Sequence, residues 1–232
     1  MSGTLYGVGL GPGDPELITL KAARLIGDAA VIAYPALEDG DSLARGIAAD
    51  LICAGTREIV LRIPMLDRRG PAQAAYDRGA DEIAAALRAG DDVVMLCEGD
   101  PLFYGSFMYV HARLSGMFDV QVVPGVTSVT ACAALAGLPL AARNEVLTVL
   151  PGTLPDDALR SRLETAQAAA IMKVGRHLGR IKAVIDALGL MERAVYVERA
   201  SLPNQRVMPL SDVDEAPYFS MILLTRGNDP WL

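Results

Sequence analysis

Short apolar runs alternate with longer amphipathic runs along the first half of the chain. The short runs end at a glycine, a proline or a polar turn, which is typical of buried strands. The longer runs repeat apolar residues every three or four positions, as amphipathic helices do. The pattern predicts strands at 5–10, 30–34, 57–63, 93–97 and 120–123, and helices at 16–26, 42–53, 71–89 and 106–114.

The alternation becomes less regular after Pro124. Strands are predicted at 146–150, 169–174, 194–198, 205–209 and 219–224, and helices at 127–136, 156–166 and 178–188. The last three strands have no long helix between them, so they favour antiparallel pairing, whereas the first half favours a parallel sheet covered on both faces. We therefore expect an α/β protein of two domains, 1–124 with a largely parallel sheet and 125–232 with a mixed sheet.

Composition restricts the class of protein. The chain has 232 residues, 52% hydrophobic positions and a formal net charge of −7, which argues against a nucleic-acid partner. The three cysteines, Cys53, Cys97 and Cys132, show no paired spacing, and only two histidines are present, so we expect neither disulfides nor a metal site. The sequence shows no signal region and no apolar run of membrane-spanning length, and we expect a cytoplasmic protein without a membrane partner.

Two Gly-Asp-Pro turns, 11–15 and 98–101, follow predicted strands. Ligands of open α/β sheets bind beyond the carboxyl ends of strands. A dinucleotide motif fails here, because Pro12 and Asp14 stand where its third glycine is needed. Asp14 and Pro15 suit the start of a helix, and a carboxylate there uses the helix dipole that a phosphate would need. The turns therefore predict a site for a small cationic ligand without phosphate.

Three strings of the sequence carry a family resemblance. Residues 9–22 (GLGPGDPELITLKA), 98–101 (EGDP) and 123–128 (VPGVTS) together resemble the signatures of the tetrapyrrole methylases, in their order and spacing. These enzymes use S-adenosylmethionine to build cobalamin and sirohaem precursors. The strings 97–113 and 145–153 resemble the branch that methylates precorrin-2 at C20, and the likeness covers nearly the whole chain.

The resemblance implies a fold, a reaction and an assembly. It implies two αβα domains with the cofactor in the cleft between them, usually in a homodimer. The implied reaction is methylation of the tetrapyrrole precorrin-2 at C20 by S-adenosylmethionine, giving precorrin-3A. Such a transfer needs alignment and exclusion of water more than acid–base groups, and arginines suit the carboxylates of the substrate.

The resemblance also implies site residues, none of which is assigned as a catalytic group. Related methylases often have glycine at the position of Glu98, so its contribution is open. The implied cofactor contacts are Pro12, Glu98, Gly99, Asp100, Phe103, Thr127, Ser128, Met172, Lys173, Ala200 and Thr225. The implied substrate contacts are Tyr104, Arg113 and Arg199.

Plainer interpretations stand beside these roles. Asp14 and Asp100 also suit helix caps, Tyr104 suits core packing, and surface positions suit the arginines. Two other functions remain open: the same methylation on the cobalt-containing substrate, and a non-catalytic binding protein for the cofactor or a tetrapyrrole. A nicotinamide oxidoreductase is disfavoured by the failed glycine spacing.

Overall fold

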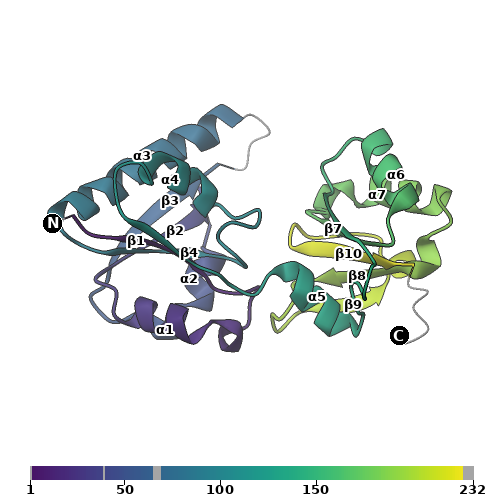
Figure 1. Cartoon of the computed structure of the whole chain (residues 1–232), viewed down its shortest axis with the longest axis horizontal. Helices are drawn as coiled ribbons and strands as arrows, with labels where there is room; N and C mark the ends of the chain where they lie inside the picture. Colours follow the sequence, from purple (N-terminus) through teal and green to yellow (C-terminus); the bar gives the residue numbers. More distant parts are fainter. Residues whose placement is uncertain (1, 39, 65–68, 227–232) are drawn as a thin grey trace. The chain divides into compact units, whose positions relative to one another are not determined.

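The computed structural model describes residues 2–38, 40–64 and 69–226, which form two compact units (Figure 1). One unit comprises the described residues up to Thr127, and the other begins at Ser128. The domain boundary that the sequence suggests, after Pro124, stays a prediction. Within the described part of the chain, no helix combines the length and the apolar composition that a membrane crossing requires.

The first unit contains a parallel sheet of five strands. The strands are β1 (Leu5–Gly9), β2 (Val31–Leu37), β3 (Arg57–Ile63), β4 (Val93–Cys97) and β5 (Val120–Val123). Their order across the sheet is β3-β2-β4-β1-β5, and every neighbouring pair is parallel. The sheet therefore confirms the parallel arrangement expected from the alternation of strands and helices, and it places β1 between β4 and β5.

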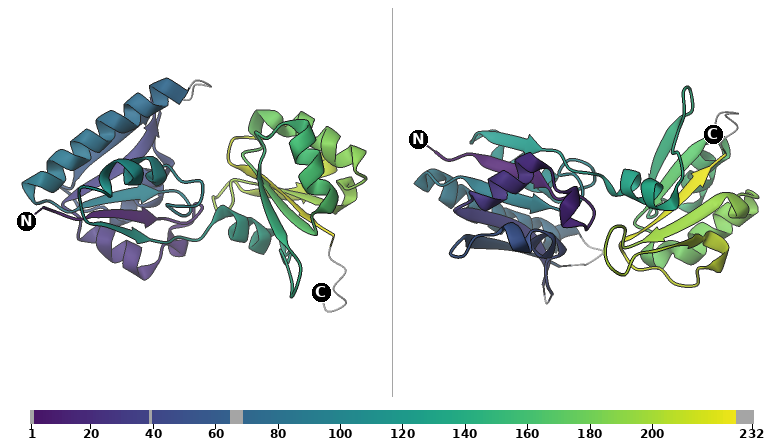
Figure 2. Two further views of the ribbon diagram at one scale, coloured as in Figure 1. Left: turned by 45° about the horizontal axis from the view of Figure 1, so that its top comes forward. Right: turned by 90° about the horizontal axis from the view of Figure 1, so that it is seen from below.

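Helices cover both faces of this sheet, as Figure 2 shows. The helices are α1 (Leu20–Gly27), α2 (Leu43–Ile47), α3 (Arg69–Ala89) and α4 (Phe107–Leu114). The central strand β4 is buried along its whole length. Val93, Met95 and Cys97 join one core with α3 and α4, and Val94 and Leu96 join a second core with α1 and α2. This alternation gives the α-β-α layering.

Some predicted element bounds are wrong. The helix predicted over 16–26 is a 3-10 turn, Pro15–Leu17, followed by α1. Ile18 is extended (φ −71°, ψ 130°), and the hydroxyl of Thr19 accepts a hydrogen bond from the N–H of Ala22 at 3.2 Å, which starts α1. The helix predicted over 42–53 is likewise α2 followed by a 3-10 turn, 49–51. Pro35 does not end β2, because β2 stays paired with β3 through Leu37. Its pairing with β4 ends at Ala33, so the missing N–H of Pro35 breaks no bond to β4.

The second unit contains a mixed sheet of five strands. They are β6 (Leu147–Pro151), β7 (Ala168–Met172), β8 (Ala194–Glu198), β9 (Arg206–Pro209) and β10 (Ser220–Thr225), in the order β6-β7-β10-β8-β9. Only β6 and β7 pair in parallel, and the other pairs are antiparallel. Helix α5 (Ser128–Ala136) packs on β8 and β10, and α6 (Asp156–Thr165) and α7 (Leu178–Ala187) form a core with the sheet. The mixed sheet is as the sequence predicts.

Candidate functional site

Three loops of the first unit meet at one edge of its sheet. They follow β1, β4 and β5, which are neighbours, so their carboxyl ends lie side by side. The loops after β1 and β4 are joined backbone to backbone: the N–H of Gly11 donates to the oxygen of Gly99 at 3.2 Å, and the N–H of Gly99 donates to the oxygen of Gly11 at 2.7 Å. The two Gly-Asp-Pro turns of the sequence are thus parts of one structure.

The third loop approaches the first two so closely that side chains are excluded. A Cβ atom on Gly125 would lie 2.2 Å from the oxygen of Gly99, and one on Gly9 would lie 2.6 Å from the nitrogen of Gly125. Gly99 itself has φ +66°, which favours glycine. These glycines therefore allow three backbones to converge.

Asp100 links two of these loops through its carboxylate. One oxygen, Oδ1, accepts a hydrogen bond from the N–H of Leu102 at 2.9 Å, and the other, Oδ2, accepts one from the N–H of Gly125 at 3.1 Å. The plainer interpretation of Asp100 as a helix cap is wrong, because α4 begins only at Phe107. Asp100 instead holds its own turn and the loop after β5, both beside the position where the resemblance places the cofactor.

Glu98 is a partly buried acid at the end of β4. Burial raises the pKa of its carboxyl above the ordinary value, and the backbone N–H of Ala44, in the first turn of α2, opposes this shift. The neighbouring Cys97 is fully buried, and its pKa is raised well above the usual range by burial and by the charge of Glu98. The loop after β4 therefore presents an acid that is partly shielded from water.

The other side chains of this edge are partly buried or exposed. Pro12, Phe103, Thr127 and Ser128 are partly buried, and Ser128 is the first residue of α5. The rings of Phe103 and Tyr104 meet edge to face, with centroids 5.2 Å apart. Tyr104 is 41% exposed, so the core-packing interpretation of its side chain is wrong.

Arg113 lies between two helices and not with the three loops. Its Nε donates to the carboxylate of Asp77 at 2.7 Å, and its two terminal nitrogens donate to the side chain of Gln73 and the backbone oxygen of Tyr109, each at 2.8 Å. The bonds to Asp77 and Gln73 join α4 to α3. The structure therefore gives the implied substrate contact at Arg113 no support.

In the second unit, most implied contacts lie at one edge of the mixed sheet. β7 ends at Met172, with Lys173 next, and Met172 pairs with Met221 near the start of β10. Glu198 ends β8 opposite Ser220, and Ala200 follows. Thr225 lies at the other end of β10, where it pairs with Ala168. The structure thus brings Met172, Lys173 and Ala200 to the same edge, and it does not bring Thr225 there.

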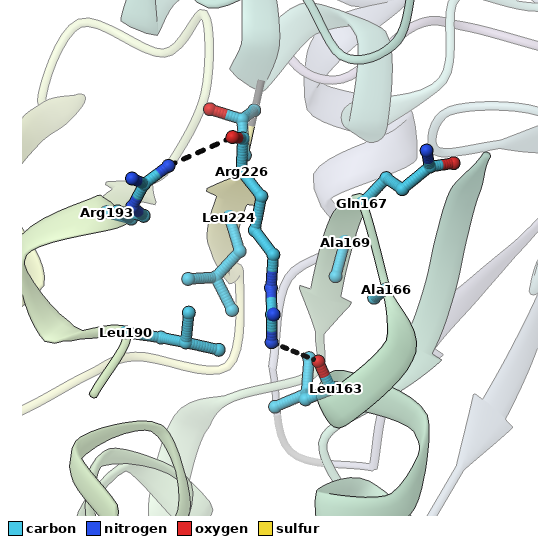
Figure 3. A pocket seen from close by; sticks show the side chains of 9 residues that line it. Leu163, Ala166, Gln167, Ala169, Leu190, Arg193, Leu224 and Arg226 are labelled. Carbon is cyan, nitrogen blue, oxygen red and sulfur yellow. Dashed lines mark hydrogen bonds between the residues drawn. The ribbon is translucent and has the colours of Figure 1, made fainter. Parts of the chain in front are cut away.

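Thr225 instead lines a small pocket at the opposite edge (Figure 3). The side chain of Arg226 runs along this pocket and donates to the backbone oxygen of Leu163 at 2.9 Å. Arg193 donates to the backbone oxygen of Arg226, also at 2.9 Å. None of the other implied site residues lines this pocket.

Glu198 is the centre of a hydrogen-bond network that the sequence analysis missed. Its side chain is 2% exposed, and its Oε2 accepts a hydrogen bond from the hydroxyl of Tyr196 at 2.7 Å. The other oxygen, Oε1, accepts from Arg199 at 2.8 Å and lies 3.6 Å from Nη1 of Arg206. Burial and Glu198 raise the pKa of Tyr196. The sequence signal for this network is Glu198 itself, a single acidic residue at the end of an apolar strand.

The chemistry of the first unit's loops suits a ligand with positive charge. Asp14 accepts a hydrogen bond from the N–H of Glu16 at 2.8 Å, as a cap, so the helical turn after β1 already has an anion at its start. Thr19 caps α1 in the same way. Phosphate would compete with these caps, whereas Asp14, Glu98 and Asp100 favour a cation nearby. The residues present thus fit a cationic ligand such as a sulfonium.

Comparison with known proteins identifies similar chains. A family model described as Tetrapyrrole (Corrin/Porphyrin) Methylases matches residues 4–214. The cobalamin biosynthesis protein CobIJ of Mycobacterium tuberculosis is 48% identical over an alignment 235 positions long, which covers 97% of this chain and 46% of that protein. The chain therefore spans about half the length of the CobIJ relatives that it matches.

Two other relatives match along nearly their full length. The precorrin-2 C(20)-methyltransferase of a Sinorhizobium species is 43% identical, covering 98% of this chain and 97% of the relative. The cobalt-precorrin-2 C(20)-methyltransferase of Salmonella typhimurium is 32% identical, covering 97% and 98%. Among solved structures, uroporphyrin-III C-methyl transferase from Thermus thermophilus complexed with S-adenyl homocysteine has a TM-score of 0.70 and 29% identity, covering 95% of this chain and 97% of that one.

Proposed function

The chain belongs to the tetrapyrrole methylase family, and we propose that it methylates precorrin-2 at C20 with S-adenosylmethionine, giving precorrin-3A in cobalamin synthesis. The observation that carries the proposal is the 43% identity to a precorrin-2 C(20)-methyltransferase over nearly the whole of both chains. The similarity to a methyltransferase structure complexed with S-adenyl homocysteine supports the choice of cofactor. The convergence of three glycine-rich loops at one sheet edge supports the place of the cofactor in the first unit.

We propose a set of cofactor contacts along the chain. When bound, S-adenosylmethionine supplies an electrophilic methyl group on a sulfonium. In the second unit, Thr225 lies at the other end of β10 from Met172, Lys173 and Ala200, so the proposed set leaves it out. The proposed set is Pro12, Glu98, Gly99, Asp100, Phe103, Thr127, Ser128, Met172, Lys173 and Ala200.

In the proposed reaction, the protein orients the bound groups and stabilises the positive charge of the cofactor. The backbone of the three loops and the carboxylate of Asp100 form a fixed edge, so bound groups meet a surface that is already ordered. The acids of these loops favour a positive charge at that edge. The half-exposed Tyr104 borders the loop and offers an aromatic face to the substrate.

Two measurements test the proposal. Calorimetry with S-adenosylhomocysteine should show binding, and the absence of binding at high micromolar concentration would refute the cofactor. Incubation of the purified protein with precorrin-2 and S-adenosylmethionine under anaerobic conditions, followed by mass spectrometry, should show the gain of one methyl group. A protein that binds the cofactor and transfers no methyl group would be a binding protein.

The cobalt-containing substrate is a second candidate, favoured by the 32% identity to a cobalt-precorrin-2 C(20)-methyltransferase. The higher identity to the relative named for the metal-free substrate puts precorrin-2 first. Parallel incubations with and without cobalt in the substrate decide between them, because methylation of the cobalt form alone would overturn the choice.

We also propose that the protein is a cytoplasmic homodimer. The resemblance to the family supports the dimer, and three cysteines without paired spacing support a reducing compartment. Light scattering coupled to gel filtration measures the mass of the assembly, and a monomer at micromolar concentration would refute the dimer. Fractionation of the source cells tests the compartment.

A further inference from the structure

We propose that Arg199 and Arg206, held together by the buried Glu198, form a binding site for one carboxylate of the tetrapyrrole substrate. The inference rests on the proposed function, because the substrate of that reaction carries acetate and propionate groups. It adds a specific site, with Arg206 as a residue that neither the motifs nor the resemblance indicates.

The geometry brings two guanidinium groups to one carboxylate oxygen. Nη1 of Arg199 lies 2.8 Å from Oε1 of Glu198, and Nη1 of Arg206 lies 3.6 Å from the same atom. Arg206 stands opposite Glu198 in the β8–β9 pairing, and Arg199 is the next residue after Glu198. Two cations thus share one anion, so the cluster keeps one net positive charge.

The exposure of the three side chains differs in a way that suits anion binding. The side chain of Glu198 is 2% exposed, whereas those of Arg199 and Arg206 are 37% and 56% exposed. The buried acid therefore holds the two guanidinium groups, while both arginine side chains are partly exposed to solvent. A guanidinium presents several N–H donors in one plane, so donors remain for a second carboxylate.

The backbone around the cluster is also fixed. Arg199 has φ 49°, and its N–H donates to the backbone oxygen of Phe219 at 2.9 Å. Ser201 has φ 63°, and its N–H donates to the side chain of Gln205 at 2.9 Å. Positive φ values at residues other than glycine persist only where the surroundings enforce them. The loop after β8 therefore holds the backbone of Arg199 in one arrangement, and Arg206 is fixed by its place in β9, which lowers the entropy lost on binding.

The charge of the surrounding segment agrees with an anionic ligand. The whole chain carries a net charge of −7, yet the segment 199–209 contains two arginines and no acidic residue. Lys173 follows β7 at the same edge of the sheet. Met172 pairs with Met221, and the residue before it, Ser220, pairs with Glu198. Ala200, a proposed cofactor contact, lies within the loop that carries Arg199. Substrate and cofactor groups would therefore meet at this edge.

Replacement of Arg206 by Met tests the site. Arg206 is the more exposed arginine and its φ is not positive, so R206M removes the charge with little cost to the fold. Loss of one charged hydrogen bond predicts an increase of about tenfold in the KM for precorrin-2, with kcat changed less than about twofold. R206K should restore part of the loss. R162M, which removes an exposed arginine of α6, is the matched control and should leave KM unchanged.

A binding measurement separates this inference from the proposed function. Uroporphyrin III is a stable tetrapyrrole with eight carboxylates, and its fluorescence reports binding without turnover. R206M should weaken uroporphyrin III binding about tenfold and leave the Kd for S-adenosylhomocysteine unchanged. Equal KM values and equal uroporphyrin III affinities for R206M and R162M would overturn the inference, even where the wild type methylates precorrin-2. The inference would also be overturned if R206M bound S-adenosylhomocysteine more weakly and melted at a lower temperature than the wild type, because Arg206 would then have a structural role. If the wild type transfers no methyl group, the proposed function fails and the titration still decides the carboxylate site.

Discussion

Replacement of Asp100 by Ala should destabilise the first unit and weaken cofactor binding together. The carboxylate accepts two backbone hydrogen bonds, from Leu102 at 2.9 Å and from Gly125 at 3.1 Å. Hydrogen bonds to charged groups contribute about 1.5–3 kcal/mol each. Because Asp100 is only partly buried, the lower end applies, and D100A should lower the free energy of unfolding by about 2–3 kcal/mol.

Replacement of Asp100 by Asn provides the matched variant. The amide has nearly the same shape as the carboxylate, but only one of its two polar atoms accepts hydrogen bonds. It can therefore satisfy Leu102 or Gly125 but not both, and an N–H group faces the other N–H. We expect D100N to lose about 1–2 kcal/mol, which places it between the wild type and D100A.

Thermal unfolding and calorimetry measure the two effects. For a chain of this size, 1 kcal/mol corresponds to roughly 2–4 °C, so D100A should lower the melting temperature by about 4–12 °C. Affinity for S-adenosylhomocysteine should fall by about tenfold or more in both variants, because the loops after β4 and β5 lose their link. A D100A protein that melts with the wild type but no longer binds would refute the link between loop stability and binding, and Asp100 would then act only as a direct cofactor contact.

Three further changes test the same structure. G125A should lower the free energy of unfolding by about 1–3 kcal/mol, because its Cβ would lie 2.2 Å from the oxygen of Gly99; G116A, with nothing within 4 Å, is the control, and equal melting temperatures would contradict the prediction. Burial raises the pKa of Glu98, so the folded protein loses stability as the pH rises above 4.5, the ordinary pKa of the group. In urea unfolding, E98Q should therefore be more stable than the wild type at about pH 7.5 but not at about pH 4. A difference in unfolding free energy that is the same at both pH values would count against this prediction. A thiol reagent should modify Cys53 alone in the native chain, because the other two cysteines are buried and burial raises their pKa values; two reactive thiols would refute this.

The buried strands could be predicted closely from the sequence. The bounds of β3, β4 and β8 are the predicted ones, because each is a short apolar or alternating run that ends at a proline, a cysteine–glutamate turn or a charged pair. A run of that length is typical of a strand and is too short for a stable helix. The parallel and mixed character of the two sheets followed from the presence or absence of helices between strands.

The first helix shows where local patterns are insufficient. Residues 16–26 have helical spacing, and Asp14 and Pro15 are good starting residues. Thr19 is an equally good cap three residues before Ala22, and the structure uses both caps in succession. Cap preferences differ by less than about 1 kcal/mol, so packing of Ile26 and Ala22 on the sheet decides where the helix begins.

The site depended on contacts between segments that are far apart in sequence. The motifs indicate that 9–13, 98–101 and 123–128 belong together, and the strand order β4-β1-β5 explains why they meet. The bond from Gly125 to Asp100 and the pairing of Glu198 with Arg206 could not be read from either segment alone. For the same reason, only the antiparallel register of β10 shows which edge Thr225 occupies.

Asp100 and Glu198 have the same kind of role in the two units, and this bears on the chemistry. Glu198 is the last residue of β8 and Asp100 lies in the loop after β4, and each uses its carboxylate to hold groups of its own unit. Transfer of a methyl group from a sulfonium requires no proton at that step, so the sites need fixed loops more than a titrating group. Activity should therefore be more sensitive to G125A and D100A, which disturb the loops, than to the loss of any one histidine.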